Sequence, residues 1–182
     1  MSKLLVHPDL SGTGPVHDVT PASAGWGHVG FALYDIAAGT SVELEGTSDE
    51  ICLVLLSGSA RIIAGDLDTG MLEGRASVFD KVAPHSVYVP MKTGWRVEAG
   101  SDAELAVCRA PGIEGRLPPR LISAENMPLE TRGTGSNVRH VCNILPETEP
   151  ADSLLVVEVI TPAGNWSSYP PHKHDTDNLP EE

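Results

Sequence analysis

Short runs rich in apolar and β-branched residues recur along the chain from Val29 onward. Gly, Asp, Ser or Pro separates most of the runs, which is typical of strands joined by tight turns. Apolar and polar residues alternate over residues 41–45, so one face of that strand is expected to be solvated. Residues 51–56 are apolar throughout and predict a strand buried on both faces, with one turn of buried helix as the alternative. The runs are VGFALYDI, TSVELE, EICLVLL, SARIIAG, RASVF, HSVYVP, GWRVEAG and AELAVCRA.

These runs predict an all-β fold in which residues 1–110 form a closed barrel or jelly roll. Residues 111–135 are rich in Pro and Gly and predict a linker, extended at LPPRLI and with a short turn near Ala124–Met127. Strand character resumes in NVRHVCNIL and LLVVEVITP. We therefore expect residues 136–182 to form the opening strands of a second β domain, too few to close a barrel.

Charge restricts the partners of this chain. It carries 25 Asp and Glu against 12 Lys and Arg, for a net charge of -13. Such a balance argues against a nucleic-acid backbone or an anionic membrane surface as partner. A small anionic substrate would need a local positive site made by a metal ion or by a few arginines.

The termini and the cysteines indicate the compartment. The first residues lack the apolar core of a signal peptide, and no stretch approaches the roughly 20 apolar residues of a membrane span. Cys52, Cys108 and Cys142 are widely spaced and lie in apolar runs, which predicts reduced core thiols. We expect a cytoplasmic protein.

Two histidines near the end of the chain are the strongest candidates for chemistry. His172 and His174 lie two residues apart and would project from the same face of a strand, where both imidazoles can reach one divalent ion. The alternative is a pair of surface histidines beside a charged tail. Trp166 and Tyr169 precede them and are candidates to wall a pocket or stack on a sugar ring, or else to fill the core of a barrel end.

Other histidines are weaker candidates. His85 is the one histidine on a candidate strand of the first barrel, and without a second nearby ligand it is expected to be a capping or core residue. His140 neighbours Arg139 on another predicted strand and is expected to be a partly exposed polar residue. The first barrel is therefore predicted to lack a metal site.

Four stretches together resemble a known enzyme family. They are TPASAGWGHVGFALYDIAAG, ICLVLLSGSA, VFDKVAPHSVYVP and, most specifically, GNWSSYPPHKHDTDNLPEE. They closely resemble the 5-deoxyglucuronate isomerases of bacterial inositol catabolism. The resemblance implies a bicupin, with two cupin (jelly-roll) barrels in one chain and a single divalent metal ion in the C-terminal barrel.

The resemblance also implies an activity and part of a ligand set. Its members convert 5-deoxy-glucuronate, an aldehyde uronic acid, to 2-deoxy-5-keto-gluconate by metal-assisted proton transfer. The first two family ligands match His172 and His174, and a Glu and a further His follow beyond the last residue printed here. We therefore expect a version of the enzyme truncated at the C-terminus. The sequence does not choose between Zn, Mn, Fe and Ni.

Several roles stay open. Arg139 is a candidate for gripping the uronate carboxylate, with an exposed strand arginine as the alternative. No catalytic acid or base is identified. A non-catalytic cupin that binds a sugar acid or metal, and an oxygen-activating metal cupin, are the competing functions. The oligomeric state is open as well, because unpaired edge strands favour either association into a homo-oligomer or a disordered tail.

Overall fold

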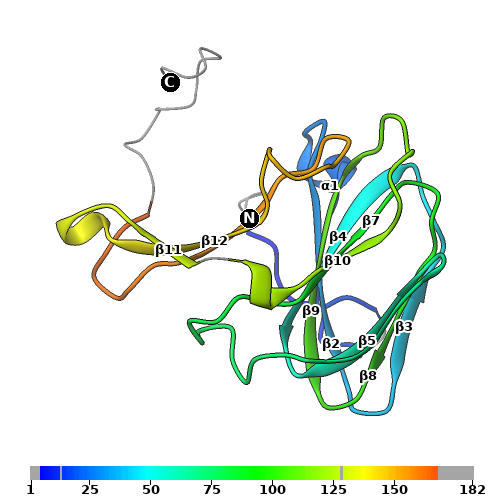
Figure 1. The fold of residues 1–182 in the computed structure, drawn as a ribbon, viewed down its shortest axis with the longest axis horizontal. Helices are drawn as coiled ribbons and strands as arrows, with labels where there is room; N and C mark the ends of the chain where they lie inside the picture. Colours follow the sequence, from blue (N-terminus) through cyan, green and yellow to red (C-terminus); the bar gives the residue numbers. More distant parts are fainter. Residues whose placement is uncertain (1–4, 13, 128, 168–182) are drawn as a thin grey trace.

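The computed structural model describes residues 5–12, 14–127 and 129–167, and it consists mainly of short antiparallel strands (Figure 1). Within these ranges the helical elements are α1 (Pro21–Ala24), η1 (Ala124–Asn126) and η2 (Gly135–Asn137), and none could cross a membrane. The strands are β1 (His17–Val19), β2 (Gly30–Ile36), β3 (Ser41–Leu44), β4 (Asp49–Ser57), β5 (Ser59–Ala64), β6 (Leu67–Glu73), β7 (Ser86–Val89), β8 (Trp95–Ala99), β9 (Ala103–Pro111), β10 (Arg120–Ile122), β11 (Leu129–Arg132), β12 (Arg139–Leu145) and β13 (Val156–Ile160). The predicted all-β class is confirmed.

Two facing sheets form the barrel. One has six strands in the order β1-β2-β9-β4-β7-β10, and the other has four in the order β3-β8-β5-β6. Because β4 pairs with β9 and β7 while β3 pairs with β8, the chain crosses repeatedly between the sheets, as in a cupin jelly roll. A third sheet, β11-β12-β13, extends away from the barrel on the left of Figure 1.

The space between the two facing sheets holds the main hydrophobic core. Strands β2, β4 and β9 turn alternate side chains into it, because strand side chains point to opposite faces in turn. Leu53, Leu55, Ile62, Val97 and Leu105 are completely enclosed there.

The outer face of the six-stranded sheet is also covered. Cys52 and Val54 of β4 pack there against Ile144 of β12 and against Leu154 in the loop before β13. Strand β4 is therefore buried on both faces, because its side chains alternate between two cores. The prediction of a doubly buried strand at residues 51–56 is confirmed.

A fully buried carboxylate fastens the second core to the barrel. Glu50 Oε1 accepts hydrogen bonds from the backbone N–H groups of Ser153 and Leu154, both at 2.5 Å. Its Oε2 accepts from the Tyr88 hydroxyl at 2.7 Å and from the Asp152 N–H at 2.8 Å. The charge is thus held by four donors, three of them in the segment that leads to β13.

A second buried contact ties β13 to the barrel. The Arg75 side chain is 2% exposed, and both of its terminal nitrogens donate to the Glu158 carboxylate of β13. Arg75 also donates to the Leu56 carbonyl at 2.7 Å and to the Val82 carbonyl at 3.1 Å. Strand β13 is therefore docked by a two-point ion pair as well as by apolar packing.

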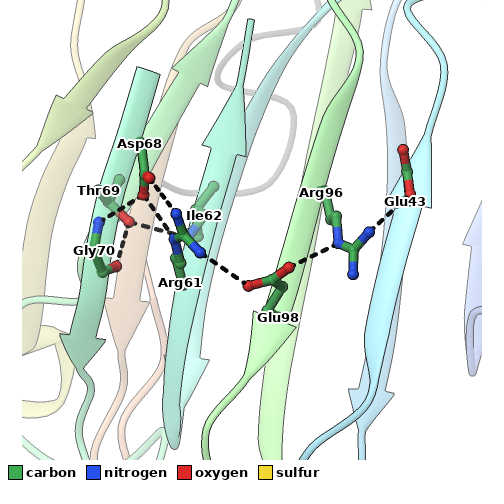
Figure 2. Close-up of polar contacts among 8 residues, drawn as sticks. All are labelled: Glu43, Arg61, Ile62, Asp68, Thr69, Gly70, Arg96 and Glu98. Atoms are coloured by element: carbon green, nitrogen blue, oxygen red, sulfur yellow. Dashed lines mark hydrogen bonds and ion pairs between the residues drawn. The ribbon is translucent and has the colours of Figure 1, made fainter. Parts of the chain in front are cut away.

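Figure 2 shows that the outer face of the four-stranded sheet is a ladder of alternating charges. Asp68, Arg61, Glu98, Arg96 and Glu43 follow one another across β6, β5, β8 and β3. Exposed ion pairs of this kind add little stability. This face is solvated and its charges are paired with one another.

Some strand predictions were wrong or missing. Residues 75–79 (RASVF) form a turn instead of a strand. The Asp80 carboxylate accepts from the Ser77 backbone N–H, and the Asp80 backbone N–H donates to the Ser77 carbonyl. Strands β1 and β6 were not predicted. Residues 111–135 contribute β10 to the six-stranded sheet and β11 to the third sheet, and η1 confirms the predicted turn at Ala124–Met127.

Candidate functional site

Two of the predicted site residues lie in the described part of the chain. Arg139 is the first residue of β12 and is half-buried. Trp166 follows β13 and is 46% exposed. Tyr169, His172 and His174 lie outside the described residues, so their roles stay predictions.

Two hydrogen bonds hold the loop after β13 against the start of β12. The Trp166 backbone N–H donates to the Ser136 carbonyl at 2.9 Å. The Asn165 side-chain amide donates to the Val138 carbonyl at 2.9 Å. Both acceptors come shortly before Arg139 in the chain, so Trp166 and Arg139 are brought to the same end of the third sheet.

A second arginine lies directly across the sheet from Arg139. The antiparallel register pairs Arg132 of β11 with Arg139 of β12, which places both side chains on one face, with Cβ atoms about 5 Å apart. Arg132 pairs with Glu130 at 2.8 Å, and Arg139 donates to the Asn137 side-chain oxygen at 2.6 Å. Two cations therefore stand beside one carboxylate, which makes this end of the sheet locally positive.

The turn that joins the two arginines requires a glycine. Gly133 has a φ of +86°, and a Cβ there would lie 2.0 Å from the Asn137 carbonyl oxygen. It would also lie 3.0 Å from Arg139 Nη1. The backbone at Gly133 thus passes close to the Arg139 guanidinium, and a residue with a side chain would not fit there.

Sequence reasoning did not single out Arg132. Residues 111–135 read as a Pro- and Gly-rich linker, so no strand was expected at β11. The sequence does contain a hairpin signal: the runs LETR and RHVCNIL flank a turn that includes Gly133 and Gly135.

The face that carries the arginines also carries Glu130 and Asn143, and it is apolar along β13. Val159 lies opposite Val141, and Val157 lies opposite Asn143, all on the same face as Arg139. Val157 is 55% exposed and Val159 is 40% exposed. A partly apolar surface with two guanidinium groups at one end is chemically suited to a small organic acid.

Two of the described histidines, His85 and His140, have structural partners. His85 Nδ1 accepts from the Ala124 N–H at 3.2 Å, and His140 Nδ1 lies 3.1 Å from the Thr131 hydroxyl on the face opposite Arg139. His140 is partly exposed, as predicted. Over residues 5–12, 14–127 and 129–167 no three His, Cys, Asp or Glu side chains are grouped closely enough to hold a metal ion.

Comparison with known proteins identifies the family. The model of the KduI/IolB family matches residues 4–182, which is nearly the whole chain. The chain belongs to the KduI/IolB family. The resemblance drawn from the sequence is thereby confirmed.

Curated relatives of this KduI/IolB chain carry the name 5-deoxy-glucuronate isomerase. The protein of Geobacillus kaustophilus is 52% identical over 184 residues, covering 100% of this chain and 66% of the relative. The protein of Bacillus subtilis strain 168 is 44% identical over 177 residues, covering 97% of this chain and 65% of the relative. The chain thus spans slightly less than two thirds of the length of these relatives.

A solved structure has the same fold. The crystal structure of an IolB-like protein from Salmonella typhimurium LT2 is 46% identical, with a TM-score of 0.87 over 94% of this chain and 65% of that one. The paired arginines and Trp166 lie within residues 4–182, the region of this KduI/IolB chain that the family model matches.

Proposed function

We propose that the chain is part of an isomerase that converts 5-deoxy-glucuronate to 2-deoxy-5-keto-gluconate in bacterial inositol catabolism. The observation that carries this proposal is the 52% identity to a curated 5-deoxy-glucuronate isomerase over the whole chain. The reaction moves one proton from C2 of the aldehyde acid to C1 and a second from the C2 hydroxyl to the aldehyde oxygen, so that C2 becomes the ketone and C1 a primary alcohol. No oxidant or reductant is consumed.

The proposed metal ligands from this chain are His172 and His174. Two neutral imidazoles suit Zn, Mn, Fe or Ni, and the remaining ligands would come from a Glu and a His of the kind that the family supplies later in its chains. A divalent ion bound there would supply Lewis-acid polarisation of the carbonyl and adjacent hydroxyl oxygens. The ion also adds positive charge to an acidic protein that must accept an anion.

The proposed substrate contacts are Arg139 for the carboxylate, and Trp166 and Tyr169 for the carbon chain. The opposite guanidinium of Arg132 supports the first role, because two forked donors match the two oxygens of a carboxylate. The hydrogen bonds of Asn165 and Trp166 to the segment before Arg139 support the second role.

The proposal extends to the organisation of the protein. Residues 1–110, joined by β10, form a cupin barrel without a metal site; the rest of residues 111–135 leads to the third sheet and supplies its strand β11, and residues 136–182 continue the metal-binding cupin domain. The protein works in the cytoplasm on a small uronic acid, without nucleic-acid or membrane partners, and associates into a homo-oligomer. Light scattering coupled to gel filtration measures that last property directly.

The test is conversion of 5-deoxy-glucuronate followed by proton NMR, with Zn, Mn, Fe and Ni supplied in turn. We expect the signals of the aldehyde and its hydrate to decline as those of the new hydroxymethyl group grow. A chelator should abolish conversion, and the same metal should restore it. His172→Gln and His174→Gln variants should remain folded by circular dichroism but inactive.

The same experiment separates the competing functions. Binding of the acid, seen as line broadening without conversion under any metal, would replace the isomerase with a sugar-acid-binding cupin. Product formation that stops under strictly anaerobic conditions would instead indicate an oxygenase.

A further inference from the structure

The barrel has a cavity of its own, at one end of the space between the two facing sheets. It measures about 160 Å³ and is lined by Tyr34, Glu45, Asp49, Ile51, Trp95 and Arg109, among others. These residues come from β2, β4 and β9 on one sheet and from β8 and the end of β3 on the other. The mouth of a β-barrel is a preferred place for small-molecule sites.

The strand pattern explains why the cavity is there. Tyr34, Ile51 and Trp95 belong to the alternating set of side chains that fills the main core. Arg109 continues the inward-facing positions of β9 after Leu105 and Val107, so the core ends at a guanidinium instead of an apolar side chain. The cavity is the space left where the apolar filling stops.

Two donors at this cavity are buried without an acceptor among the described residues. Trp95 is 2% exposed, and its indole Nε1–H has no hydrogen-bond partner there. Arg109 Nε is likewise buried and unpaired, while Arg109 Nη2 donates to Asp18 at 2.5 Å. Buried N–H groups are normally satisfied, so these two point to a hydrogen-bonding occupant.

The other polar groups decide which kind of occupant fits. Arg109 is already neutralised by Asp18, and Glu45 and Asp49 add two carboxylates to the lining. The local charge is therefore negative and disfavours an organic anion. Burial raises the pKa of Tyr34, so its hydroxyl stays protonated at neutral pH.

We propose that the N-terminal barrel binds a small neutral polyhydroxy compound, a polyol or monosaccharide, in this cavity. The rings of Tyr34 and Trp95 would pack against its C–H groups, as aromatic side chains do with apolar ligand faces. Its hydroxyls would accept from Trp95 Nε1 and Arg109 Nε and donate to Glu45 and Asp49. This site is independent of the proposed isomerase reaction and of the arginine pair on the third sheet.

The test uses Trp95 as its own reporter. In a Trp26→Phe/Trp166→Phe variant, Trp95 is the only indole, and its emission is followed during titration with glycerol, xylitol and glucose as neutral probes. Gluconate at matched ionic strength is the anionic control of similar size. We expect a saturable change with xylitol or glucose and at least a tenfold weaker response to gluconate.

Two variants link the response to the cavity. Glu45 is exposed, so Glu45→Gln should leave folding intact. This variant should bind the neutral probe about threefold more weakly, and the difference in affinity between the neutral probe and gluconate should become smaller. Trp95→Phe keeps a ring but removes the N–H, and saturation-transfer NMR on the full chain should show at least a fivefold loss of affinity. His172→Gln/His174→Gln should change neither result, which separates this site from the isomerase.

Three results would each contradict binding of a neutral polyhydroxy compound in this cavity. The absence of saturation by every neutral probe up to molar concentration would overturn the proposal. Equal responses to glucose and gluconate, or binding unaffected by Trp95→Phe, would overturn it as well.

Discussion

At the scale of single residues, Glu50 shows how a buried charge can organise a fold. It is completely enclosed, yet each of its oxygens faces two donors. A carboxylate offers only acceptors, which is what four converging N–H and O–H groups require. Burial, together with the hydrogen bond to Glu50, also raises the pKa of Tyr88 well above its usual value, so Tyr88 remains a donor over the physiological range.

Replacing Glu50 with Gln should therefore be costly. An NH₂ group in place of Oε1 would face the backbone N–H groups of Ser153 and Leu154, and both would lose their acceptor. An NH₂ group in place of Oε2 could donate to the Tyr88 hydroxyl, but the Asp152 N–H would still lose its acceptor. We expect the free energy of unfolding to fall by about 3 kcal/mol. Urea denaturation measures it, with Tyr88→Phe as the control, because it removes one of the four donors and should cost about 1 kcal/mol. A Glu50→Gln protein within 0.5 kcal/mol of the wild type would contradict this account.

Asp152 makes the stability of the docked segment depend on pH. Its carboxylate accepts from the backbone N–H groups of Gly115, Ile113 and Glu114, each at 2.9 Å, and these bonds lower its pKa. A lowered pKa stabilises the folded state above the unfolded value near 4, and this contribution is lost as the pH falls through the folded value.

The matching experiment compares the wild type with Asp152→Asn. Asparagine can still accept these bonds but carries no charge. The difference in unfolding free energy between the two proteins should be largest at pH 7 and shrink as the pH is lowered from 5 to 3. A difference that stays constant over this range would show that the charge of Asp152 does not matter.

At the scale of elements, the β11–β12 hairpin turns two unremarkable arginines into a pair. Neither Arg132 nor Arg139 has a spacing that marks it as functional, and only the antiparallel register sets them opposite each other. Like charges placed opposite on neighbouring strands oppose folding. A bound carboxylate would relieve that repulsion.

Arg139→Gln and Arg132→Gln should each raise KM for 5-deoxy-glucuronate about tenfold, because a charge-assisted hydrogen bond is worth about 1.5 kcal/mol or more. The value of kcat should change less than twofold, since the carboxylate does not react. Arg116→Gln is the matched control, because that side chain is 81% exposed and pairs with Glu114 in a loop. A loss confined to kcat would assign the arginines a different role.

The same hairpin marks how far the sequence could predict the structure. Strands with a clear apolar run, such as β2, β4 and β9, were predicted because their side chains face one or two cores. Strand β6 (LDTGMLE) and strand β11 (LETR) were missed, because they contain turn-forming or charged residues and depend on a neighbouring strand for their hydrogen bonds. Each pairs with an adjacent strand along the chain, β5 or β12, so what was lacking was an apolar run and not a nearby partner.

The candidate site was predictable to a similar extent. Residue type and position near a strand end were enough to propose Arg139 and Trp166. The hydrogen bonds that bring their segments together involve backbone groups of Ser136 and Val138, which any residue could supply. The buried roles of Glu50 and Arg75 were likewise invisible, because both residues read as charges beside apolar runs.

At the scale of the whole molecule, the chain has two cores that share one sheet. The inner core lies between the facing sheets and contains Trp95. The outer core lies between the six-stranded sheet and the docked C-terminal segment, and it contains Cys52 and Cys142. Burial raises the pKa of Cys142 to about 11 and that of Cys52 further, so both thiols are protonated and hidden at pH 8.

This arrangement predicts that the outer core can open while the inner core stays closed. Glu50 and Arg75 fasten the docked segment, whereas the barrel closes through its own strand pairs. In the Glu50→Gln variant a loss of about 3 kcal/mol confined to the outer layer would raise its open population on the order of 100-fold. Alkylation of Cys52 and Cys142 at pH 8, followed by peptide mass spectrometry, should accelerate by that factor.

The emission of Trp95, in a background without Trp26 and Trp166, serves as the control for the inner core. It should keep its native maximum under the conditions in which the two thiols become reactive. If emission and alkylation change together, the two cores unfold as one unit, and Glu50 contributes to global stability. If alkylation stays slow while urea denaturation shows the expected loss, the docked segment does not open separately from the barrel, because the shared strand β4 couples the cores.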